Sequence, residues 1–305
     1  MNDAAEATPR VRRRDRVLLH EVAGGVALGR RVRVTEIGAR QTKEAPPYGA
    51  LRAAGMAHVT AFEPEPDAYA ALVADAPEHT TVHPLAIGAP GPATLYAHKI
   101  ASLTSIFPFS APAARFLGKG FWVNRPVTEI PVDLVALDDV PGLADGIDIL
   151  KMDIQGAERD AIEGGRRALS ECMVVIPEVR FYRMYDGEPM LAELDQSLRA
   201  QGFVLHKFLH QKSVISPSPQ AKRLEKAGVR NQLLDGDAVY IRSIEDPETV
   251  TTDQLKVLAL AAASVFDSPD LCCHCLHLLT LRGAVAPDLA ETFARRAVPA
   301  MDELT

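Results

Sequence analysis

Two acidic residues and a glycine lie at the ends of the first two β-rich runs of the sequence, in a pattern typical of adenosine binding. Residues 31–37 form the first run, which contains Glu36 and stops at Gly38, and residues 58–62 form the second, which Glu63 follows. A glycine at a strand end lets the backbone approach a ligand closely. An acidic residue about 20 residues further on can accept hydrogen bonds from ribose hydroxyls. We therefore expect an adenosine-containing ligand at this edge of a sheet.

The residues after Gly38 argue against a dinucleotide. They read Ala39, Arg40, Gln41 and Thr42, so the full Gly-x-Gly-x-x-Gly that cradles a pyrophosphate is missing. Three alternatives stay open on this pattern alone: an adenosine cofactor other than NAD, NAD held without that fingerprint, and a turn that binds no ligand.

Two further carboxylates end later apolar runs and are the candidates for acid or base chemistry. Asp153 follows residues 147–152, and Glu178 lies near the end of residues 173–179. Carboxyl ends of strands in open α/β sheets face the ligand crevice, where a carboxylate can take a proton. Asp153 is the leading candidate and Glu178 the second. The alternative for each is a helix cap or an ion pair.

The runs that position these residues alternate with helical segments of about ten residues, which indicates right-handed βαβ crossovers and a mostly parallel sheet. A last strand is expected to be antiparallel at the sheet edge. Further strands are predicted at 81–87, 130–137, 147–152, 173–179, 203–209 and 238–242, and helices at 46–54, 66–74, 155–169 and 189–200.

We divide the chain into an N-terminal segment (1–30), one α/β domain (31–245) and a helical C-terminal extension (246–305) with helices at 252–265, 269–282 and 287–297. The strand at 238–242 should close the sheet, so we expect the extension to be an add-on that also offers a surface for self-association.

Residues 100–126 break the alternation with an aromatic segment rich in proline, serine and glycine. Such a stretch inside a compact domain is either a functional lid or packing. Its aromatic residues, together with Tyr182 and Tyr185, would either line an acceptor pocket or belong to the core.

Composition narrows the class of protein. The 305 residues carry a net charge of −7, which argues against nucleic-acid binding as the main role. No apolar run reaches the roughly 18 residues of a membrane span, and no signal core follows the N-terminal arginines, so we expect a cytoplasmic protein. The run Cys272, Cys273, His274 and Cys275 allows a zinc site, but its helical spacing favours buried thiols, so no metal is expected.

Five blocks, taken in order, resemble those of the FkbM-type S-adenosylmethionine (SAM)-dependent methyltransferases, over about residues 32–242. The octet from Lys151 to Glu158 is the most specific, because it joins a strand end, an Asp and a helix start. The blocks read Glu36-Ile37-Gly38-Ala39, Ala61-Phe62-Glu63-Pro64-Glu65-Pro66, Pro84-Leu85-Ala86-Ile87-Gly88, Ile149-Leu150-Lys151-Met152-Asp153-Ile154-Gln155-Gly156-Ala157-Glu158 and Pro177-Glu178-Val179.

The resemblance implies a Rossmann-like class I methyltransferase fold, with a seven-stranded, mostly parallel sheet, SAM as cofactor and methyl transfer to a hydroxyl of a sugar, glycan or secondary metabolite. Carried over, Glu36, Gly38 and the adjacent Ala39 would border the methionine part and Glu63 the ribose. Ala86 and Ile87 would contact the adenine, and Asp153 would lie at the methyl-transfer end.

One departure supports an alternative function. The family usually has an Asn and a second glycine in the first loop, where this chain has Arg40 and Thr42. A bulkier loop would crowd the cofactor, so the alternative hypothesis is a catalytically silent methyltransferase fold that acts as a binding or scaffolding protein.

Overall fold

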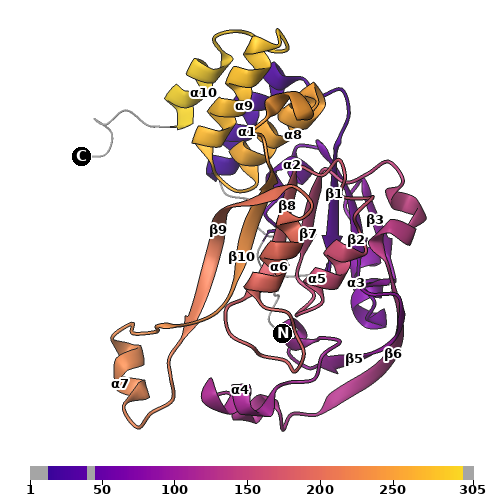
Figure 1. Ribbon diagram of the computed structural model, residues 1–305, viewed down its shortest axis with the longest axis vertical. Coiled ribbons are helices and arrows are strands. Elements are labelled where there is room, and N and C mark those ends of the chain that lie inside the picture. The colour runs from indigo at the N-terminus through magenta and orange to yellow at the C-terminus, as the bar shows by residue number, and fades with distance from the viewer. Residues whose placement is uncertain (1–12, 40–44, 298–305) are drawn as a thin grey trace, which may run out of the picture.

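A seven-stranded sheet lies at the centre of the computed structural model, which describes residues 13–39 and 45–297 (Figure 1). The strand order is β3-β2-β1-β7-β8-β10-β9. The first five are parallel, and β10 is antiparallel to both β8 and β9. The predicted seven-stranded, mostly parallel sheet is therefore confirmed. The strands are β1 (Val32–Ile37), β2 (Ala57–Phe62), β3 (Thr80–His83), β7 (Ile149–Met152), β8 (Val174–Arg180), β9 (Phe203–Val214) and β10 (Gln232–Arg242).

Side chains that alternate along the strands fill two apolar clusters, one on each face of the sheet. Val34 and Ile176 belong to the first cluster, and Leu150 and Val175 to the second. Helices α5 (Glu158–Glu163) and α6 (Leu191–Arg199) contribute Ile162, Leu198 and others to the second. Burial on both faces explains why these strands read as continuous apolar runs.

The C-terminal helices cover the first face instead of forming an add-on. In α8 (Thr252–Ser264), every residue from Val257 to Ser264 is buried, and the helix shares the cluster of Val34 and Ile176. A capping box at its start, in which Thr251 and Gln254 exchange hydrogen bonds, fixes where it begins. The expectation that the sheet is closed without this extension is wrong.

An N-terminal helix that the sequence analysis does not predict joins this group. Helix α1 (Arg13–Val26) packs against α8 and α10 (Leu289–Ala297), and α9 (Pro269–Leu281) completes the bundle. Figure 1 shows the four helices together at one end of the molecule, so the two ends of the described chain are neighbours in space.

Three further predictions differ from the structure. The strand predicted at 81–87 is split at Pro84, and its second half enters a small sheet of β4 (Ala86–Ile87), β5 (Gly91–His98) and β6 (Val127–Val135). Strand β10 lies inside the sheet, because β9 takes the edge. The helix predicted from Gln155 begins only at Glu158, since Gln155 and Gly156 adopt positive φ angles of 55° and 115°.

The aromatic segment forms a cap with a third apolar cluster. Leu103 and Leu117 pack with Met184 and Tyr185, which follow β8, and with Leu234 of β10. The remaining helices are α2 (Gly49–Ala53), α3 (Pro66–Ala74), α4 (Ala111–Phe116) and α7 (Ala221–Lys226), with 3-10 turns η1 (Ala101–Leu103), η2 (Gly120–Trp122), η3 (Leu137–Asp139), η4 (Pro141–Leu143) and η5 (Pro247–Thr249).

The packing of α8 predicts that the core depends on the C-terminal helices. Leu258→Ala empties a fully buried position and should lower the free energy of unfolding by about 2–5 kcal/mol in chemical denaturation. Leu281→Ala is the control, because Leu281 is 70% exposed and its loss should cost no more than about 0.5 kcal/mol. Equal effects of the two substitutions would contradict this packing.

Candidate active site

The carboxyl ends of β2, β1 and β7 bring three predicted site residues to one edge of the sheet. Gly38 donates its backbone N–H to the carbonyl of Phe62 at 3.0 Å. Asp153 donates its backbone N–H to the carbonyl of Ile37 at 3.0 Å. Glu63 directly follows Phe62, so Gly38 lies between Glu63 and Asp153, as expected for neighbouring parallel strands.

Gly38 is required by the packing of this edge. Its φ is +80°, and a Cβ built on it would lie 2.1 Å from the carbonyl oxygen of Asp153. The next residue, Ala39, is buried and donates its N–H to the same Phe62 carbonyl. The turn after β1 is thus held between β2 and β7 by contacts that no other residue type at position 38 would permit.

The two glutamates after β2 have different roles. Glu65 caps α3, because its carboxylate accepts the backbone N–H groups of Asp67 and Ala68. Glu63 is 5% exposed, and its Oε1 accepts the N–H of Glu65 at 2.9 Å. The local turn therefore fixes the Glu63 carboxylate at the strand end and leaves the capping of the helix to Glu65.

Gln155 connects the two candidate carboxylates. Its Nε2 donates to Oδ1 of Asp153 and to Oε2 of Glu178, both at 2.7 Å. Its Oε1 accepts from Nη2 of Arg180 at 2.6 Å and from the hydroxyl of Tyr185 at 3.2 Å. Both hydrogens and both lone pairs of the amide are used, which holds Asp153 and Glu178 as a pair.

Glu178 lies beside Asp153 in an acidic environment. Burial, followed by the Asp153 charge, raises its pKa well above the usual range, although Arg180 opposes this. Nη2 of Arg180 lies 2.8 Å from Glu178, and its other nitrogens lie 3.3 Å from Glu188 and from Asp235. The guanidinium is therefore neutralised by three carboxylates, and it cannot fully offset the charge around Glu178.

Glu36 is engaged within the protein. The Tyr48 hydroxyl donates to its Oε2 at 2.5 Å, and burial raises the pKa of Glu36, opposed by that hydrogen bond and by the charge of Lys151. Lys151 in turn donates to Oδ1 of Asp237 at 2.9 Å. Glu36 thus lies at the predicted sheet edge but with a tyrosine as its partner.

Ala86 and Ile87 lie in the small sheet, whereas the other predicted site residues lie at the edge of the seven-stranded sheet. Both are buried in β4 and pair with Leu134 and Val135 of the small sheet. Ile87 also packs in the cluster that contains Phe62, the residue before Glu63. Arg40 and Thr42 lie outside the described residues.

The structure decides one alternative for Asp153. Helix α5 has Ala157 as its N-cap and no side-chain cap bond, so Asp153 is not a helix cap. Instead, Glu158 accepts the N–H groups of Ile154 and Gly156, both at 2.9 Å, and closes the turn. Asp153 is exposed at the strand end, where it can meet a ligand.

Sequence reasoning missed Gln155 and Arg180. The one local signal was Gly156, whose positive φ interrupts the expected helix. Tyr185 proves to be a core residue, since it is fully buried, stacks on Phe109 at a centroid distance of 4.8 Å and donates to the Leu103 carbonyl at 3.2 Å.

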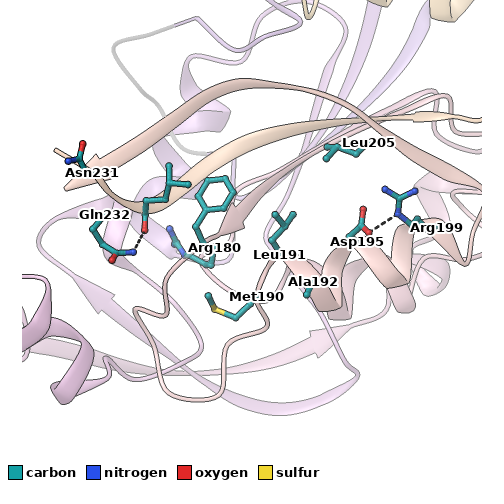
Figure 2. Close-up of a pocket in the computed structure, with 11 residues that line it drawn as sticks. Arg180, Met190, Leu191, Ala192, Asp195, Arg199, Leu205, Asn231 and Gln232 are labelled. Carbon is teal, nitrogen blue, oxygen red and sulfur yellow. Dashed lines mark hydrogen bonds and ion pairs between the residues drawn. The ribbon is translucent and has the colours of Figure 1, made fainter. Parts of the chain in front are cut away.

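A groove lies beside this edge and not on it. It has a volume of about 790 Å³ and runs between α6 and the bases of β9 and β10 (Figure 2). Leu191, Leu205 and Leu233 form apolar walls, and Arg180 connects it to the Glu178 network. We place the site at the strand ends because the titratable groups converge there.

The cysteines behave as the sequence predicts. Cys272 and Cys275 are buried with Leu276 and Leu279 on one side of α9, and burial raises the pKa of Cys275 to about 12. Within residues 13–39 and 45–297, no group of three or more His, Cys, Asp or Glu could hold a metal ion. No helix in the same part of the chain is long and apolar enough to cross a membrane.

A comparison with family models identifies the family of this chain. Residues 36–205 match the model of the methyltransferase FkbM domain. A solved magnesium protoporphyrin IX methyltransferase (ChlM) from Synechocystis PCC 6803 with bound SAM is 13% identical, with a TM-score of 0.34, over 75% of this chain and 77% of that chain. A precorrin-6y C5,15-methyltransferase from Geobacter metallireducens GS-15 is 12% identical, with a TM-score of 0.33, over 77% and 94%. The search of curated proteins gives no match.

The contact between Gly38 and Asp153 predicts a graded pair of substitutions. Gly55→Ala should cost about 1–2 kcal/mol of folding free energy, because Gly55 has a φ of +68° but nothing within 4 Å of an added Cβ. Gly38→Ala should lower the free energy of unfolding clearly more, because the clash of the new Cβ with the Asp153 carbonyl oxygen at 2.1 Å adds to the same conformational strain. Denaturation midpoints measure both, and equal losses would show that the turn is not packed as described.

Proposed function

Because the chain belongs to the methyltransferase FkbM domain family, which the match over residues 36–205 shows, we propose that it transfers a methyl group from SAM to a hydroxyl oxygen of a sugar, a glycan or a secondary metabolite. The observation that carries this proposal is the meeting of Gly38, Glu63 and the exposed Asp153 at the ends of three adjacent parallel strands.

The residues at this edge fit the cofactor. The Glu63 carboxylate can accept hydrogen bonds from ribose hydroxyls. The turn at Gly38 and Ala39 lies beside Glu63, because both of its N–H groups bond the carbonyl of Phe62 at the end of β2. Ala86 and Ile87 are our candidates for an apolar contact with the adenine, because Ile87 packs in the cluster that contains Phe62, the residue before Glu63. Glu36 lies two residues before Gly38, and its carboxylate is held by the hydroxyl of Tyr48.

Bound SAM supplies a methyl group that is already activated as a sulfonium. The protein must then orient the acceptor hydroxyl and receive its proton. Asp153 is exposed and suited to both tasks, and Gln155 fixes its carboxylate through the 2.7 Å hydrogen bond. Glu178 is the second candidate base, because burial and the Asp153 charge give it a high pKa and hence a high proton affinity.

The proposal predicts that Glu63 binds the cofactor. Glu63→Ala should weaken the binding of S-adenosylhomocysteine by about 1–3 kcal/mol, because a charged hydrogen-bond acceptor is lost. Glu65→Ala is the matched control: it removes a helix cap and should lower stability by about 1 kcal/mol while leaving affinity unchanged. Unaltered affinity in Glu63→Ala would mean that the cofactor lies elsewhere.

The assignment of Asp153 as base predicts a separation of rate from binding. Asp153→Asn keeps the shape of the side chain, so S-adenosylhomocysteine affinity should largely survive while single-turnover methyl transfer falls by about 10²–10⁴-fold. The acceptor for this assay comes from a screen of hydroxylated sugars and metabolites with labelled SAM.

Two other results would redirect the assignment. A parallel loss of affinity and rate would show that Asp153 binds the methionine amino group. Near-normal turnover would exclude Asp153 as base and make Glu178→Gln the next variant to measure.

A further inference from the structure

Exposed apolar side chains are concentrated in two stretches of the described chain. Of the eleven large hydrophobic residues that are exposed, eight lie within residues 100–127 and 224–233. The other three, Val17, Val73 and Leu281, are scattered. Single exposed apolar residues need no explanation, but a concentration of them marks an interaction surface. The eight are Ile100, Phe116, Phe121, Val123, Val127, Leu224, Val229 and Leu233.

The first stretch, and the second when it is extended back to residue 212, are basic in an acidic protein. Residues 100–127 contain three basic and no acidic side chains, and residues 212–233 contain five basic and one acidic, whereas the whole chain has a net charge of −7. Two of the cations lie over aromatic rings: Arg125 is 5.3 Å from the centroid of the exposed Phe121, and Lys119 is 5.7 Å from that of the partly buried Trp122.

Contacts within the fold join the two stretches into one surface, which we call the basic apolar surface (residues 100–127 and 212–233). Val214 of β9 packs in the same cluster as Leu117 and Trp122. A Cβ on Gly118 would lie 3.6 Å from Cβ of Pro217. Figure 1 shows both α4 and α7 at the end of the molecule opposite the C-terminal helices, with α7 on a projecting hairpin of β9 and β10.

The basic apolar surface lies on the side of the sheet that carries the candidate active site. Ser105 donates its hydroxyl to the Gln155 carbonyl at 2.7 Å, and Phe116 stacks on Tyr182, which follows β8, at 5.0 Å. A partner that covers this surface would therefore approach the edge of the sheet where Asp153 is exposed.

We propose that the basic apolar surface binds an anionic lipid bilayer, so that the protein associates peripherally with membranes. Lysine and arginine near an anionic leaflet each contribute about 1 kcal/mol, and apolar side chains that project beside them insert at the interface. Six of the eight exposed residues are aliphatic. Aliphatic tips suit hydrocarbon and offer no ring for base stacking, which makes a lipid surface a better fit than single-stranded RNA.

The test is co-sedimentation of the full-length protein with vesicles of phosphatidylcholine, alone or mixed with phosphatidylglycerol. At about 0.1 M salt the protein should bind the mixed vesicles and not the neutral ones, and about 1 M salt should release it, because screening shortens the Debye length to about 3 Å. The triple variant K222E, R223E and K226E should bind at least about a hundredfold more weakly, given about fivefold for each of the three cations lost.

Matched controls come from residues outside the basic apolar surface. The triple variant R16E, R295E and R296E changes the charge equally and should keep most of the binding. F121S with L224S should lose binding, whereas L281S with V73S should not. Absence of binding to the anionic vesicles, equal losses in both triple variants, or retention of a single-stranded RNA in place of vesicles would each overturn the proposal, provided that melting temperatures show folded variants.

Discussion

The side-chain amide of Gln155 is the constraint on which the geometry of the candidate site depends. The amide donates to two carboxylates and accepts from a guanidinium and a phenol. The backbone carbonyl of Gln155 accepts a further hydrogen bond from Ser105 of the cap. The backbone must adopt a φ of +55° to place it there, a strained conformation for a residue other than glycine. The five hydrogen bonds that result join the ends of β7 and β8, the segment after β8 and the cap.

This network lies at one edge of a sheet whose two faces are covered by helices. The candidate site residues lie at the carboxyl ends of the parallel strands, while apolar side chains along these strands fill a cluster on each face of the sheet. One face is covered by α5 and α6, and the other by α2 and by helices from both ends of the described chain. The site can thus keep several buried charges close together, because the surrounding sheet is fully packed.

The sequence predicts the sheet and most of its strands, because strands buried on both faces leave long apolar runs. The burial of α8 could have been anticipated, since residues 257–264 are apolar or small on every side. The Gln155 network could not, because its partners Glu178, Arg180 and Tyr185 are 23 to 30 residues away and only the fold brings them together. The same holds for Tyr48, whose bond to Glu36 crosses the turn after β1.

The edge formed by Gly38, Glu63 and Asp153 should bind SAM and no dinucleotide. Isothermal titration of the full-length protein with S-adenosylhomocysteine, and separately with NAD, measures this. We expect saturable binding of S-adenosylhomocysteine at one site for each chain and no heat of binding with NAD. A folded protein that binds neither ligand at millimolar concentration, or that binds NAD alone, would contradict it.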